Sequence, residues 1–332
     1  MAIAYSGLTQ WVDESRLDFF MDAVASNDVL PFARKYGDVI TGVKADSIKL
    51  PNLTTSITIA DGTACFTDID GNNDSTISQT TINLKKGLVR DQICVHGLED
   101  YYTAQGLAAG QHYTGLGALE AGIFTDVARQ TGKAIGNEMW NGGSNWITSG
   151  WIDQLYAATG IETGGSTTPT AGGSAGTDPE GVFNIVELLV NAARADVDFG
   201  SDVSAGNVVI VMSPKEYSFY FQNYRKLFGD NLITPGLQFL ADGSMAPVYH
   251  PGSRVEIVQQ NFLTGTGTVI LTRKKNFVVA LDLESDLGAM KMGMDQYEEF
   301  IWWKFRFKAG VGIRDISANS VLYYGPASKA TT

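Results

Sequence analysis

Residues Glu298–Ile313 read EEFIWWKFRFKAGVGI, and the alternation in this stretch guides the interpretation of the whole chain. From Trp303 onward the odd-numbered positions are apolar, and the even-numbered positions include Lys304, Arg306 and Lys308. Period-two alternation is typical of a strand that is half buried against a core. We therefore predict a strand with one apolar and one basic face, and the basic face must meet water, nucleic acid or another protein.

The composition is that of an acidic globular protein. The chain has 332 residues, of which 44% are hydrophobic, so it can bury a sizeable core and is long enough for two domains. Its 36 acidic and 24 basic residues give a net charge of -12. Dedicated DNA- or RNA-binding proteins gain affinity by neutralising phosphates, so this charge argues against that class.

The cysteines and the apolar runs indicate the compartment. Cys65 and Cys94 cannot build a disulfide framework, and no Cys or His spacing suggests zinc. No apolar run approaches the roughly 20 residues of a membrane span, and the N-terminal sequence lacks the order of a signal peptide. We therefore expect a protein made in a reducing cytoplasm, with no membrane partner.

Two long elements are predicted in the first half of the chain. Residues 39–84 are rich in Thr, Ile and Ser with turn residues at 68–75, which predicts a two-stranded excursion followed by a returning strand. Residues 118–140 carry apolar side chains at helical spacing and precede the sequence NGG, which predicts a helix roughly 35 Å long. The Gly/Ser/Thr stretch 163–177 is predicted to be a mobile loop.

A compact α/β unit is predicted over residues 178–285. Asp178 followed by Pro179 is typical of a helix start, and VFNIVELLVNAARADV is expected to continue that helix. Ser213 and Glu216 form a capping-box pattern after the strand NVVIVM. The strands RVEIVQ, TVILTR and NFVVALDL are expected to close the unit.

The histidines and Ser213 are weak catalytic candidates. His96, His112 and His250 have no second histidine at metal spacing and no local nucleophile motif. Ser213 lies at a strand-to-helix turn, but it lacks the glycines of G-x-S-x-G, so a helix cap is the better interpretation.

The acidic run DIDGNNDS is a weak metal candidate. It brings Asp68, Asp70 and Asp74 close together, but the Gly and Glu positions of an EF-hand are not matched, so a hairpin tip is the better interpretation. An enzyme built on the α/β unit is an alternative that would need convergent polar residues, which the sequence does not display. We therefore predict no enzyme activity, no metal and no cofactor.

The order of these elements resembles that of the major capsid protein of tailed bacteriophages, the Hong Kong ninety-seven fold. The resemblance is carried by AIGNEMWNGG, GWIDQLYAATGI, NVVIVMSPKEYSFYF and DQYEEFIWWKFRFKAGVGIRDISANSVLYYG. Together these segments cover most of the chain from about residue 30. The resemblance implies an α+β fold with an N-terminal arm, a long extended β loop, a peripheral domain with a spine helix, and an α/β axial domain.

The resemblance also implies domain boundaries. The arm, in which a short amphipathic helix is predicted, is residues 1–30. The first part of the peripheral domain is residues 31–149, with the extended loop at about 45–92 and the spine helix at about 118–140. Residues 150–285 are the axial domain, and residues 286–332 complete the peripheral domain.

The implied function is self-assembly into hexamers and pentamers of an icosahedral shell that encloses phage double-stranded DNA. Such a protein belongs to a virion assembled in the host bacterial cytoplasm. Its implied partners are other copies of itself and a portal, with either a separate scaffold protein or none, and with or without decoration proteins. Packaged DNA is contacted non-specifically, because an acidic lining repels it. An encapsulin, a bacterial compartment shell of the same fold, is the alternative, although the long loop and the arm argue against it.

The resemblance finally implies a partner for the basic strand face. In the family the extended loop of one subunit lies across the peripheral domain of its neighbour, and here residues 50–84 contain no Lys or Arg. We expect the apolar side chains Trp303, Phe305 and Phe307 to pack against the spine helix. The expected inter-subunit contact joins the loop carboxylates to the strand cations: Asp61, Asp68, Asp70 and Asp74 with Lys304, Arg306 and Lys308.

Overall fold

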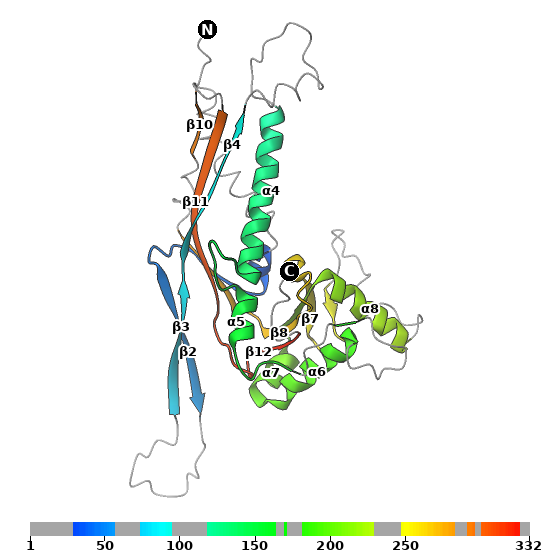
Figure 1. Cartoon of the computed structure of the whole chain (residues 1–332). Coiled ribbons are helices and arrows are strands. Elements are labelled where there is room, and N and C mark those ends of the chain that lie inside the picture. The colour runs from blue at the N-terminus through cyan, green and yellow to red at the C-terminus, as the bar shows by residue number, and fades with distance from the viewer. Residues whose placement is uncertain are drawn as a thin grey trace, which may run out of the picture.

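The computed structural model describes residues 29–56, 74–94, 118–163, 169–170, 181–228, 247–282, 291–295 and 300–325. These residues form two five-stranded sheets with associated helices, and a two-stranded ribbon that projects away from them (Figure 1). The architecture agrees with the predicted α+β class. The predicted arm helix and most of the Gly/Ser/Thr stretch lie outside the described residues.

The first sheet is organised around the strand that contains the alternating sequence. β11 (Phe300–Ile313) pairs with β10 (Lys291–Asp295) and β4 (Lys85–Cys94) along its first part, and with β9 (Phe277–Leu281) along its last part. β1 (Asp38–Ile40) pairs in parallel with β9. The prediction of a long strand at this place is therefore confirmed.

A separate antiparallel ribbon is formed by β2 (Ser47–Ser56) and β3 (Asp74–Asn83), and it extends away from both sheets (Figure 1). This confirms the predicted two-stranded excursion, and β4 is the predicted returning strand. At the base of the ribbon, buried apolar side chains form a small core of their own: Val43, Leu50, Ile82, Leu84, Val278 and Ala280.

The ribbon crosses β11 at two glycines. A Cβ atom on Gly310 would lie 2.4 Å from the carbonyl oxygen of Asn83, and one on Gly312 would lie 2.5 Å from the side chain of Ile82. A side chain at Gly310 would clash with the β3 backbone and one at Gly312 with the Ile82 side chain, so the glycines of KAGVGI allow β3 to pass close over the sheet.

The predicted spine helix is α4 (Ala118–Asn141), which ends one residue later than expected. Gly142 directly after it has a φ of 67°, a conformation that glycine adopts without steric cost. Ile135 and Met139, two of the residues expected on its apolar face, are buried.

An aromatic cluster joins α4 to the first sheet and to two short helices, α2 (Val29–Lys35) and α5 (Trp151–Ala157). The rings of Trp140 and Trp151 lie 4.8 Å apart, edge to face. Phe32 of α2 and Phe277 of β9 lie 5.4 and 5.6 Å from Trp140. This cluster belongs to a core that also includes residues of the second sheet, such as Ile270.

The second sheet has the strand order β12-β8-β5-β7-β6, and its helices lie to one side of the ribbon in Figure 1. Its strands are β5 (Val208–Met212), β6 (Val248–Tyr249), β7 (Glu256–Gln259), β8 (Val269–Arg273) and β12 (Val321–Tyr324). Its helices are α6 (Val182–Ala195), α7 (Val197–Ala205), α8 (Pro214–Phe228) and the short 3-10 helix η1 (Asn261–Leu263).

Two strands cross the domain boundary that was predicted at residue 285. The sequence NFVVALDL is predicted to close the α/β unit, but β9 pairs with β1 and β11 in the first sheet. The closing segment is predicted to complete the peripheral domain, but β12 pairs with β8 in the second sheet. The prediction is wrong for both strands because both are apolar, and local pattern does not specify which sheet an apolar strand joins.

The start of α6 and the end of the same predicted helix also differ from expectation. Gly181, and not Asp178, is the N-cap of α6, and Gly181 forms a β-bridge with Thr170. The expected continuous helix is divided at Asp196, whose carboxylate accepts a hydrogen bond of 2.8 Å from the amide of Phe199 and so caps α7. An aspartate that can bond its own backbone favours a cap over a helix interior.

Candidate inter-subunit surface

The even-numbered side of the β4–β11 pair carries a set of cations. The antiparallel register places Arg90 opposite Lys304 and Lys86 opposite Lys308. Directly opposite residues point to the same side of a sheet, so these cations and Arg306 share one side. Lys86, Arg90 and Arg306 are exposed and Lys304 is half-buried. We call Lys86, Arg90, Lys304 and Arg306 the basic face.

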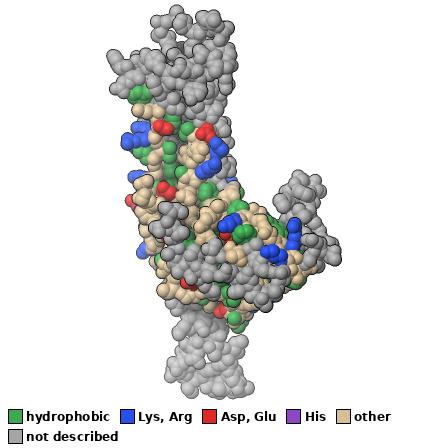
Figure 2. Space-filling view, turned by 45° about the vertical axis from the view of Figure 1, so that its right-hand side comes forward, with side chains coloured by type: hydrophobic (Ala, Val, Ile, Leu, Met, Phe, Trp, Pro, Cys, Tyr) green, Lys and Arg blue, Asp and Glu red, His purple; other side chains and the backbone are tan. Residues whose placement is uncertain are grey.

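Two cations of the basic face, Arg90 and Lys304, lie directly opposite each other. Like charges directly opposite each other destabilise an antiparallel pair. Within the described ranges, none of these four cations is in an ion pair, although the Lys86 charge contributes to the lowered pKa of Asp46. The Lys304 ammonium lies 6.0 Å from the centre of the Trp302 ring. In Figure 2, Lys and Arg side chains lie along the upright part of the molecule, with acidic side chains among them. The register alone therefore defines the basic face, which has four cations on one side of two paired strands.

Lys308 is not part of the exposed face, contrary to the prediction. Its side chain is 6% exposed, and its ammonium group lies 2.9 Å from the carboxylate of Asp46 in the same chain. The hydrogen bond from Lys308 is the largest cause of a lowered pKa of the Asp46 carboxyl group. Lys308 is buried because the base of the ribbon covers this part of β11, a long-range contact that alternation along one strand cannot reveal.

The four predicted carboxylates lie almost entirely outside the described residues. Asp61, Asp68 and Asp70 belong to the undescribed stretch between β2 and β3. Asp74 is the first residue of β3, opposite Ser56. The contact between these carboxylates and the basic face therefore stays a prediction.

The apolar side of β11 packs inward as predicted, but with a different partner at one position. Trp303 is buried. The ring of Phe307 meets that of Trp146 edge to face at 4.6 Å, and Trp146 follows α4 instead of belonging to it. Opposite Phe307, Gly87 leaves room for the ring, because a Cβ atom there would lie 2.5 Å from it. The side chain of Phe305 lies outside the described ones.

Sequence reasoning missed the cations that β4 adds to the basic face. The sequence KKGLVRDQ places Lys86 and Arg90 on either side of Leu88, with the same period of two as β11. This alternation was an available signal. The register of β4 against β11 was not, because the two strands are far apart in sequence.

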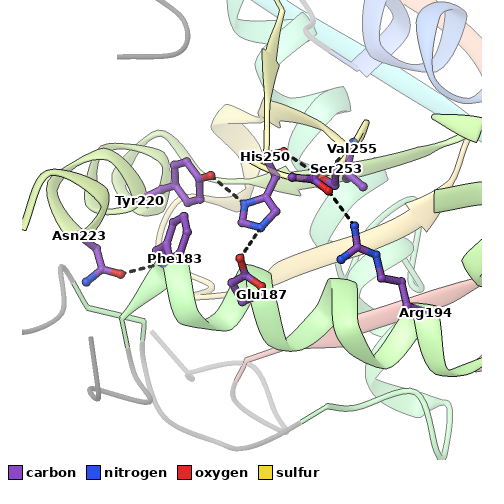
Figure 3. A network of polar contacts seen from close by, with 9 residues as sticks. Phe183, Glu187, Arg194, Tyr220, Asn223, His250, Ser253 and Val255 are labelled. Atoms are coloured by element: carbon purple, nitrogen blue, oxygen red, sulfur yellow. Dashed lines mark hydrogen bonds and ion pairs between the residues drawn. The ribbon is translucent and has the colours of Figure 1, made fainter. Parts of the chain in front are cut away.

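A buried polar cluster surrounds His250, which follows β6 (Figure 3). The imidazole Nδ1 lies 2.9 Å from the Tyr220 hydroxyl of α8, and Nε2 lies 3.1 Å from a carboxylate oxygen of Glu187 on α6. Burial lowers the pKa of His250, against the opposing effect of the Glu187 carboxylate. The cluster ties the turn after β6 to two helices. His96 and His112 lie outside the described residues.

Ser213 caps α8 as predicted, but its contact with Glu216 is made through the hydroxyl and differs from the reciprocal backbone bond of a capping box. Its hydroxyl oxygen accepts from the amides of Lys215 and Glu216 at 3.2 and 3.4 Å, and its hydroxyl donates to the Glu216 carboxylate. Burial raises the pKa of Glu216.

The described residues contain no group of three or more His, Cys, Asp or Glu that could hold a metal ion. No described helix is both long and apolar enough to cross a membrane.

No protein-family model and no curated protein matches the chain. Solved structures do match it. The capsid of Myoviridae phage XM1 matches with a TM-score of 0.54 at 12% identity, covering 88% of this chain and 90% of that chain. The capsid of a native GTA particle matches with a TM-score of 0.52 at 14% identity, covering 89% and 90%. The capsid of an empty GTA particle matches with a TM-score of 0.51 at 14% identity, covering 89% of each chain.

The chain has the fold of a phage capsid protein. The predicted capsid fold is thereby confirmed, at identities that establish the fold and not the function. The basic face lies on the first sheet, and the ribbon falls within residues 45–92, the range predicted for the extended loop, whereas β4 at the end of that range belongs to the first sheet.

Proposed function

We propose that the chain is the major subunit of a phage shell, which assembles into hexamers and pentamers around double-stranded DNA. The observation that carries this proposal is the match to capsid structures over 88% and 89% of the chain. The proposal places the protein in a virion assembled in the host cytoplasm. It also implies a structural and not an enzymatic role, with a portal and scaffold or decoration proteins as further partners.

An encapsulin shell is the alternative within the same fold. The phage shell is favoured because the matched structures are capsids of a phage and of a GTA particle. Negative-stain microscopy of the expressed chain tests the proposal. Closed, angular shells or regular sheets of hexamers support it. Particles that stay dispersed at high protein concentration, with and without co-expressed neighbouring phage genes, would contradict it.

We also propose that the basic face binds the acidic loop of a neighbouring subunit. Four cations face the same side without a described ion pair, and residues 50–84 carry only acidic charges. Each exposed pair contributes only ~0 to 1 kcal/mol. The contact recurs in every subunit of a shell, however, so it would select which surfaces dock and in which register.

Charge reversal tests this contact without disturbing the core. Lys304→Glu with Arg306→Glu should leave the subunit folded and impair assembly, and Asp68→Lys with Asp70→Lys should restore it in part. Lys308 is left unchanged, because a glutamate there would place an unpaired charge in a buried site.

A matched control makes the same change in net charge elsewhere. Lys133 and Arg225 are exposed on α4 and α8. The variant with both reversed to glutamate should not assemble better when the two loop substitutions are added. Normal assembly of the Lys304/Arg306 variant would show that the basic face is simply solvated. Rescue of the control variant would show that the loop substitutions act through net charge alone.

A further inference from the structure

Lys308 is a buried cation. The described partners of its ammonium group all lie at residues 44–46, which we call the entry of the ribbon because they directly precede β2. Its ammonium nitrogen lies 2.9 Å from the carbonyl oxygen of Lys44, 2.9 Å from that of Ala45, and 2.9 Å from a carboxylate oxygen of Asp46. An ammonium group has three donors, so each finds an acceptor. Because a buried charge is costly without partners, the backbone at residues 44–46 is held where it presents these oxygens.

Gly42, which lies just before the entry of the ribbon, has a left-handed backbone conformation. Gly42 has a φ of 84°, and a Cβ atom there would meet nothing within 4 Å. One residue later, the amide of Val43 donates to the carbonyl oxygen of Leu281 at 3.2 Å. The amide of Leu84 donates to the carbonyl oxygen of Asp46 at 2.9 Å, which joins the two stems of the ribbon. Lys308 therefore acts where the chain leaves the first sheet.

The other strand of the ribbon is held by the following residues on the same side of β11. Gly310 makes room for the backbone of β3 at Asn83, and Gly312 makes room for the Ile82 side chain. The Thr80 hydroxyl donates to the carbonyl oxygen of Arg314 at 2.9 Å. One side of β11 thus has two parts. Lys308, Gly310 and Gly312 contact the chain's own ribbon. On the same side, Arg306 is exposed and Lys304 is half-buried.

We propose that Lys308 is the anchor that fixes the direction in which the ribbon leaves the body of the subunit. It is a positioning residue within one chain and not a contact between subunits. Three acceptors on consecutive residues define the orientation of the segment that precedes β2, while the glycine crossing fixes β3. This proposal does not depend on the proposed shell function, because every contact lies within the chain.

Hydrogen exchange on dispersed Lys308→Met protein tests the anchor. Methionine retains much of the apolar stem and loses the charge. The amides of Val43 and Leu84 should exchange about tenfold faster or more, since hydrogen bonds to a charged group are lost beside them. Amides of β5 and β8 should be unchanged. Arg306→Met is the matched control, because it removes an exposed cation from the same side of the same strand, and it should leave the two amides unaffected.

A distance measurement reads the direction of the ribbon. Spin labels on cysteines introduced at Ile77 on the ribbon and Val197 on α7, both exposed, with Cys65 and Cys94 replaced by serine, should give a narrow distance distribution in the parent protein. Lys308→Met should broaden or shift it, and Arg306→Met should not.

The outcomes separate an anchor from a merely buried lysine. Exchange within twofold of the parent at Val43 and Leu84, together with an unchanged distance distribution, overturns the proposal, as does an equal effect of Arg306→Met. If Lys308→Met does not fold, Asp46→Ala decides, since Asp46 is an exposed residue whose loss removes only one acceptor. It should accelerate exchange at the same two amides by a smaller factor, and no acceleration would refute the anchor.

Discussion

Tyr36, which directly follows α2, contacts the second sheet through its hydroxyl, and Tyr36→Phe should lower the free energy of unfolding measurably. The Tyr36 hydroxyl donates to a carboxylate oxygen of Glu256 on β7, and the Lys35 ammonium lies 3.2 Å from the same oxygen. Glu256 and Tyr36 are buried, whereas the Lys35 side chain is 63% exposed. One buried carboxylate therefore has one buried and one exposed partner.

The expected magnitudes follow from this difference. Phenylalanine keeps the ring and its packing on Phe32, whose ring centre lies 5.6 Å away, so the substitution removes the hydroxyl's interactions with Glu256 and Lys35. A buried hydrogen bond to a charged group contributes about 1.5 to 3 kcal/mol, so we expect about 2 kcal/mol for Tyr36→Phe. Lys35→Met removes a largely solvated pair and should cost less than about 1 kcal/mol. Urea denaturation followed by far-UV circular dichroism measures both.

The pH dependence gives an independent check. Burial, and then the hydrogen bond to Glu256, raise the pKa of Tyr36 from 10.0 to about 12. The folded state therefore holds a proton that the unfolded state releases near pH 10, and stability from this group falls as pH rises from 10 to about 12. The difference in unfolding free energy between the parent and Tyr36→Phe should be constant below pH 10 and should narrow above it.

Three results would refute this reasoning. A loss below about 0.5 kcal/mol for Tyr36→Phe would place the hydroxyl in contact with water, because such a loss is typical of exposed substitutions. A larger loss for Lys35→Met than for Tyr36→Phe would reverse the assigned roles. A difference that widens between pH 10 and 11 would contradict the sign of the pKa shift.

Two further substitutions test the packing around β11. Gly310→Ala should destabilise the ribbon base by about 1 to 3 kcal/mol, because the new Cβ would lie 2.4 Å from the backbone oxygen of Asn83, and faster proteolysis of the ribbon would report it. Trp151→Phe should lower stability by about 1 kcal/mol more than Trp140→Phe, because the Trp151 indole donates to the carbonyl oxygen of Gly312 at 3.0 Å and the Trp140 indole nitrogen has no described partner. Equal urea midpoints for the two tryptophan variants would contradict the second expectation.

The candidate site was predictable only in part. Alternation in KFRFK indicated a cationic strand side, and the resemblance supplied a partner for it. The contribution of Lys86 and Arg90 required the register between β4 and β11. The exclusion of Lys308 required knowledge that residues 44–46 return to that strand. In each case the missing information was a pairing between residues far apart in sequence.

Elements whose signals are local could be predicted from the amino-acid sequence. Hydrophobic period distinguishes the helix 118–141 from the strand 300–313, and the bonds by which Ser213 caps α8 lie within four residues. The packing of the whole chain places β9 in the first sheet and β12 in the second, contrary to the local prediction, and it brings Tyr36 to Glu256. Those choices depend on which distant surfaces bury each apolar strand and satisfy each buried polar group. A strand carries the information that one side must be buried, and its partner is selected only when the whole chain packs.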